Sequence, residues 1–101
     1  MVIADGSAPA LEIYTRSWPA LARAHLAVRG TLNGATGAQL AEEVDAVLDR
    51  DHTVILDLSE VAEIDAAGVQ AIKDCERQAV GLGAELFVQD PSPVARLALR
   101  A

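Results

Sequence analysis

Four carboxylates lie close together in the middle of the chain, at Asp57, Glu60, Glu63 and Asp65. Carboxylate oxygens are the ligands that Mg²⁺ and Ca²⁺ prefer, so this cluster is the first candidate for a metal site. The spacing does not match a calcium-binding loop, in which a central glycine makes the sharp turn. In the alternative, Asp57 ends a strand, Asp65 caps a helix, and the two glutamates between them are solvated. We therefore expect no metal ion here.

Three other side chains are candidate nucleophiles, Ser59, Cys75 and Ser92. A hydrolase needs its nucleophile next to a base, and none of the three lies in a motif such as Gly-x-Ser-x-Gly. The glycines between residues 30 and 37 match neither the Gly-x-Gly-x-x-Gly pattern nor the lysine-containing nucleotide loop. We expect no enzyme activity and no cofactor.

Composition narrows the classes of partner. The 101 residues suffice for one domain, and the formal net charge is -7 with eight basic residues that form no cluster. Nucleic-acid affinity comes mainly from Lys and Arg, so we do not expect nucleic-acid binding. The single cysteine, Cys75, suits a reducing cytoplasm. The apolar runs are strand-sized, far below the roughly 20 residues of a membrane span, so no membrane insertion is expected.

The elements that position the carboxylates are a strand and a helix. Residues 54–58 form a nearly continuous apolar run, typical of a central strand covered on both faces. A short acidic turn is expected next, followed by a helix at Asp65. The Asp65 carboxylate can accept hydrogen bonds from the free N–H groups of the first helical turn.

Two strands and a helix are expected before this segment. Residues 11–15 alternate like an edge strand that Ser17-Trp18-Pro19 breaks, and residues 25–32 form a second strand, paired with the first as a hairpin. Thr36 and Gln39 fit a capping box, so a helix should begin near Thr36 and run to about Leu48 or Arg50.

The rest of the chain continues the alternation of strand and helix. One helical stripe after Asp65 is expected to face inward, and it contains Gly68, Ala71, Ile72, Cys75, Ala79 and Leu82. Residues 85–89 read as a fourth strand and Pro93 as the start of a last helix. This order implies right-handed crossovers and a largely parallel sheet after the hairpin. Residues 1–9 are expected to be flexible.

Three segments in this order resemble the STAS domain family, whose best-known members are bacterial anti-sigma factor antagonists. The resembling segments are Leu26–Asn33, the strand and Asp65-Ala66-Ala67-Gly68 turn, and the Pro91-Ser92-Pro93 turn with its flanking strand and helix. The resemblance implies an α/β fold over residues 10–101: a single STAS-like domain with a mixed four- to five-stranded sheet and helices mainly on one face.

The resemblance also implies a function. An antagonist of this kind binds an anti-sigma factor or serine kinase-like protein and thereby releases a sigma factor. In members that switch, the partner phosphorylates the hydroxyl residue after the Asp, and that position is Ala66 here, which has no oxygen. The implied partner-binding residues are Asn33, Asp65, Ala66, Ala67, Gly68 and Val69.

A second reading stays open. The chain could be a non-switching STAS scaffold subunit of a phospholipid ABC transport system or of a stressosome-like assembly. The transporter subunit often keeps Thr in the turn, so Ala66 is atypical for it too. Self-association through the exposed edge strand, giving a homodimer, is also left open.

Overall fold

The structure is a computed structural model, and it describes residues 11–100. Along this range the elements are β1 (Leu11–Trp18), a 3₁₀ turn η1 (Pro19–Leu21), β2 (Arg23–Leu32), α1 (Gly34–Leu48), β3 (Thr53–Ile64), α2 (Ala66–Gly81), β4 (Glu85–Gln89) and α3 (Pro93–Arg100). The segment 1–9, for which we predicted flexibility, and the predicted domain start at residue 10 lie outside the described residues.

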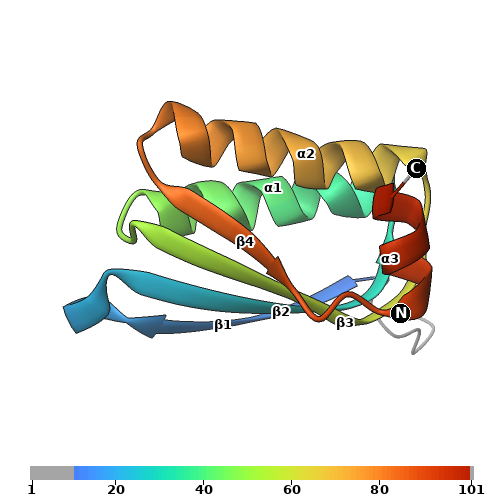
Figure 1. The fold of residues 1–101 in the computed structure, drawn as a ribbon, viewed down its shortest axis with the longest axis horizontal. Coiled ribbons are helices and arrows are strands. Elements are labelled where there is room, and N and C mark those ends of the chain that lie inside the picture. The colour runs from blue at the N-terminus through green and yellow to red at the C-terminus, as the bar shows by residue number, and fades with distance from the viewer. Residues whose placement is uncertain (1–10, 101) are drawn as a thin grey trace, which may run out of the picture.

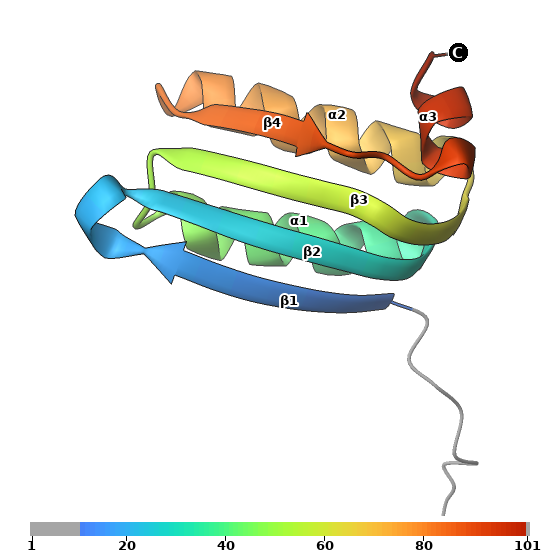
Figure 2. The same cartoon turned by 60° about the horizontal axis from the view of Figure 1, so that its bottom comes forward.

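The strands form one sheet in the order β1-β2-β3-β4. β1 and β2 are antiparallel, whereas β2–β3 and β3–β4 are parallel, because helices make the two crossovers. α1 and α2 lie side by side on one face of the sheet, and α3 packs at the end where β3 finishes (Figure 1). The opposite face carries no helix (Figure 2). The predicted fold class is confirmed.

The core between sheet and helices is aliphatic. Its fully buried side chains come from both the sheet and the helices and include Leu26 and Val28 of β2, Leu40 of α1, and Leu56 of β3. The chain's one Tyr, one Trp and one Phe are all exposed instead, with Tyr14 at 55%, Trp18 at 39% and Phe87 at 51%. Within residues 11–100, no helix is long and apolar enough to cross a membrane.

The acidic turn predicted after Leu58 is wrong, because β3 continues through it to Ile64. Residues 60–64 pair with residues 29–32 of β2, and two register shifts absorb the extra residues. Val61 is buried at 2% exposure. The sequence-based prediction failed here because the pairing strand lies about 30 residues away in the chain.

Two smaller boundaries also differ from the predictions. β1 runs through Ser17 and ends at Trp18, directly before Pro19, which has no N–H to donate. Leu82, predicted to face inward, is 60% exposed because α2 ends at Gly81 and the helical periodicity ends with it. Gly83 then takes a positive φ of 74°, which glycine adopts at no steric cost.

The position of α2 on the sheet depends on Gly68. A Cβ atom at this residue would lie 2.5 Å from the carbonyl oxygen and 2.8 Å from the carbonyl carbon of Leu32, the last residue of β2. Both distances are far inside van der Waals contact. Only glycine lets the first turn of α2 lie directly on the end of β2.

We predict that Gly68→Ala destabilises the domain by about 1–3 kcal/mol, because the added methyl group must push α2 away from the backbone of β2. Chemical denaturation measures the loss. Gly81→Ala on the same helix is the control: nothing lies within 4 Å of its Cβ position, so it should be neutral or stabilising by up to about 1 kcal/mol. Equal stabilities for the two variants would contradict the close packing.

Cys75 gives a second prediction. Its side chain is 1% exposed, and burial raises the pKa of the thiol to about 11, with the nearby Asp74 and Glu76 carboxylates adding to the effect. Because the thiolate is the reactive form, alkylation of the folded protein near pH 8 should be much slower than in denaturant. Mass spectrometry follows the labelling, and an exposed thiol introduced by Ala46→Cys should react quickly in the same sample.

Candidate functional site

The candidate site lies where two neighbouring parallel strands end and two helices begin. β2 ends at Leu32 and is followed by Asn33 and α1, while β3 ends at Ile64 and is followed by Asp65 and α2. An open hollow of about 280 Å³ lies between the strand ends, lined by Thr31, Leu32, Asn33, Glu63, Ile64 and Asp65. Carboxyl ends of parallel strands are the usual place for a functional surface in α/β folds.

Asp65 caps α2, as the sequence predicts. Its Oδ1 accepts a hydrogen bond from the N–H of Gly68 at 2.9 Å, and its own N–H donates to the Leu32 carbonyl at 3.2 Å. The side chain therefore satisfies a free N–H of the helix, while the backbone holds α2 to the end of β2. The predicted start of α2 is confirmed.

Residues 65–69, named the docking turn here for the partner contact predicted from the sequence, expose some residues and bury others. Asp65, Ala66 and Ala67 are exposed, Gly68 is buried and Val69 is half-buried. The accessible part of this surface therefore consists of the methyl groups of Ala66 and Ala67 beside the Asp65 carboxylate that caps the helix. Gly68 contributes by allowing close packing and offers almost no surface of its own.

Asn33 caps α1, so the predicted capping box at Thr36 and Gln39 is wrong. Asn33 Oδ1 accepts from the Thr36 N–H at 3.0 Å, and the Asn33 N–H donates to Thr36 Oγ1 at 2.8 Å. The Thr36 hydroxyl also donates to the Thr31 carbonyl at 2.7 Å. Thr36 is therefore the third helical residue of the box, and α1 begins at Gly34, within two residues of the predicted start.

A groove between α1 and α2 extends from the docking turn, and the sequence analysis did not identify it. Its volume is about 300 Å³, and it is lined by Gly34, Gly37, Ala38, Ala41, Ala67, Gln70, Ala71 and Asp74. The helices approach closely, since a Cβ atom on Gly37 would lie 2.7 Å from that of Ala71. The feature of the sequence that indicates this groove is the helical spacing of small residues on both α1 and α2.

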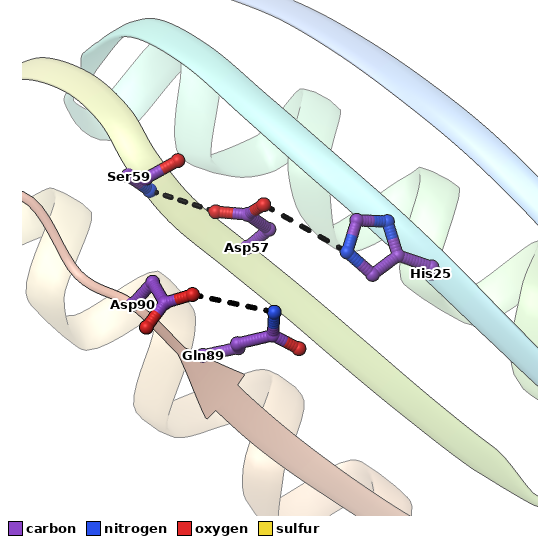
Figure 3. A network of polar contacts seen from close by, with 5 residues as sticks. All are labelled: His25, Asp57, Ser59, Gln89 and Asp90. Carbon is purple, nitrogen blue, oxygen red and sulfur yellow. Dashed lines mark hydrogen bonds and ion pairs between the residues drawn. The ribbon is translucent and has the colours of Figure 1, made fainter.

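The four carboxylates of the supposed metal cluster point to different partners. Asp57 faces His25 at 3.8 Å and accepts the Ser59 backbone N–H at 3.0 Å, on the sheet face without helices (Figure 3). Glu60 pairs with Arg29, and Glu63 accepts from Thr31 Oγ1 at 3.2 Å. Among residues 11–100, no three His, Cys, Asp or Glu side chains come together as metal ligands.

The candidate nucleophiles have structural surroundings. Ser92 is 8% exposed, and its hydroxyl donates to the Val61 carbonyl at 2.7 Å and accepts from the Ala95 N–H at 3.2 Å. Asp57 contacts Ser59 through the backbone N–H, so this carboxylate does not activate the hydroxyl. Cys75 is buried in the core. None of these three side chains is hydrogen-bonded to a carboxylate or an imidazole of the described residues, the arrangement that would activate a nucleophile.

The fold is similar to that of several solved structures. An anti-sigma factor antagonist from Mycobacterium paratuberculosis has a TM-score of 0.76 and 20% identity, with 93% of this chain and 80% of that chain covered. The unphosphorylated anti-sigma factor antagonist SpoIIAA has a TM-score of 0.74, 14% identity, and 88% and 78% coverage. The phosphorylated Bacillus SpoIIAA has a TM-score of 0.71 and 14% identity, with 88% and 81% coverage.

Part of an anion transporter shares the fold as well. In the murine anion transporter Slc26a9 the match has a TM-score of 0.68 and 19% identity, covering 79% of this chain but only 14% of that one. No curated protein sequence matches the chain. The model of the family described as "Mlab, STAS domain" matches residues 20–101. The match over most of the sequence, together with the shared fold, shows that the chain belongs to the STAS domain family.

Proposed function

We propose that the domain is a regulatory protein-binding module of the antagonist type. It binds an anti-sigma factor or serine kinase-like partner through the docking turn and Asn33, and so releases a sigma factor. The observation that carries the proposal is the exposure of Ala66 and Ala67 at the strand ends, next to a carboxylate already engaged in capping. Family membership and the shared fold of two antagonists support it.

The physical character of this surface favours a protein partner. Its centre consists of methyl groups and backbone, so a partner can approach closely and exclude water. The groove between α1 and α2 continues the same surface, because Ala67 of the docking turn also lines the groove. A Cβ atom built on Gly34 of α1 would lie 3.8 Å from the Cβ atom of Ala67. Asp74 of α2 is one of the residues that line this groove, and Asp45 of α1 is hydrogen-bonded to Gln78 of α2. Basic residues around the partner's contact surface would therefore speed association.

Ala66 sets how the binding is regulated. In the family the hydroxyl residue after the Asp is the phosphorylation site, and SpoIIAA exists in both forms. Ala66 has no oxygen to receive a phosphate, so the module stays competent to bind and responds to abundance or to another site. The output is a binding equilibrium between partners and needs no catalysis or cofactor.

The scaffold reading remains the second candidate, and two findings favour it. The family model carries the description Mlab and names no antagonist, and the same fold occurs within an anion transporter. Affinity capture from lysate of the native organism distinguishes the two: recovery of an ATP-binding anti-sigma kinase supports the antagonist, whereas recovery of a transporter ATPase supports the scaffold subunit.

We predict that Ala66→Glu weakens binding of the captured partner about ten- to a hundredfold, because charge and bulk enter the contact surface. The fold should persist, since a carboxylate is favourable in the first turn of a helix. Isothermal calorimetry and thermal melting measure the two effects.

The control for this experiment is Ala46→Glu, which adds the same charge to an exposed position of α1 outside the docking turn. It should leave affinity within about twofold, since surface changes away from a hot spot contribute little. Undiminished affinity of Ala66→Glu would place the interface on another surface and remove the antagonist proposal.

A further prediction concerns phosphorylation by a partner kinase. The wild-type chain should incorporate no phosphate in the docking turn, whereas Ala66→Ser should be phosphorylated there. Phosphate on Ser59 or Thr31 in the wild type would show that the switch has moved. Thr36 is a poor acceptor, because its hydroxyl is buried and holds the cap of α1. Mass spectrometry locates the phosphate.

A further inference from the structure

β1 is the outermost strand of the sheet, and one of its edges has no strand beside it among the described residues (Figure 2). Its other edge pairs with β2 over eight consecutive residue pairs, from Leu11–Gly30 to Trp18–Arg23, without a register shift. β1 contains no proline, glycine or bulge. A regular strand with an unpaired edge offers a row of backbone N–H and C=O groups to another strand.

The charges of β1 are arranged to be complementary to a second copy of β1. When two copies lie antiparallel with Tyr14 opposite Tyr14, Glu12 of each copy lies opposite Arg16 of the other, because directly opposed residues share a face. Two-fold symmetry produces this ion pair twice. Shifting the register by two residues places Arg16 opposite Tyr14 and loses both pairs.

The side chains involved are free to meet across such an edge. Tyr14 is 55% exposed, and its hydroxyl donates to Glu12 Oε2 at 3.1 Å. Because the Thr15 hydroxyl reaches Glu43 of α1 and side chains alternate along a strand, Glu12, Tyr14 and Arg16 lie on the sheet face without helices. Arg16 is exposed, and within residues 11–100 it has no carboxylate at ion-pair distance. The helices do not obstruct the approach, because α1 packs mainly over β2 and β3.

We propose that the protein forms a homodimer in which β1 pairs antiparallel with β1 of a second copy, in the register that sets Glu12 opposite Arg16. The two four-stranded sheets then form one continuous sheet. Backbone hydrogen bonds between the two β1 strands stabilise the dimer, and the two ion pairs select the register in which the strands pair.

Sedimentation equilibrium over a concentration series tests this interface by charge reversal. Glu12→Arg and Arg16→Glu should each raise the dimer dissociation constant at least about tenfold, because symmetry turns both attractive pairs into repulsive ones. The double variant Glu12→Arg/Arg16→Glu should restore an affinity near that of the wild type. Added salt should weaken the wild-type and double-variant dimers alike.

Arg96→Glu, at an exposed position of α3, is the matched control, since it changes the net charge as Arg16→Glu does. It should leave the dimer intact, and circular dichroism should show all variants folded. A wild-type protein that stays monomeric throughout the series overturns the proposal. A double variant that dimerises no more tightly than the single variants also overturns it. The same holds if neither charge reversal changes the dimer dissociation constant, because the dimer would then form through another surface.

Discussion

The arrangement of the site depends on one close approach, between the first turn of α2 and the last peptide group of β2. The Leu32 carbonyl accepts the Asp65 N–H, and a Cβ atom on Gly68 would clash with the same carbonyl group. Because no side chain separates them, the start of α2 lies beside Asn33 and the start of α1. The second close approach, of Gly37 to Ala71, keeps the two helices together beyond the docking turn. Residues with small side chains therefore determine the shape of the surface.

Both helices begin with a side chain that accepts a hydrogen bond from their free N–H groups. Asn33 does this for α1 and Asp65 for α2. Since these polar groups already have partners, the surface between them offers shape and methyl groups more than reactive chemistry. Such a surface gains affinity by excluding water from a well-fitting partner, and neighbouring charges contribute mainly to specificity and association rate. A single added carboxylate or phosphate at this place changes both fit and charge.

The distribution of side-chain size follows from the same close packing. Between the helices and the sheet the core consists of aliphatic side chains such as Leu40 and Leu56, which are fully buried. The aromatic residues lie outside this core, two of them on β1. Aromatic side chains contribute strongly where proteins meet. The outer edge at β1 and the sheet face without helices therefore carry exposed aromatic side chains, whereas the docking turn exposes mainly methyl groups.

The amino-acid sequence predicts the order of strands and helices, the inward faces of α1 and α2, and the cap at Asp65. These features depend on hydrophobic periodicity and on hydrogen bonds between residues three apart, so a short window of sequence contains them. Three features became clear only in the folded structure: residues 59–64 belong to β3, Asn33 caps α1, and a groove between the two helices begins at the docking turn. The Asn33 cap is a local contact between residues three apart, and it was missed because Thr36 fits a capping box in the same short window. The other two features depend on segments distant in the chain: β3 continues because β2 lies beside it, and the groove exists because Gly37 meets Ala71. Contacts of this kind are decided by packing in three dimensions, where nonlocal pairing overrides local preference.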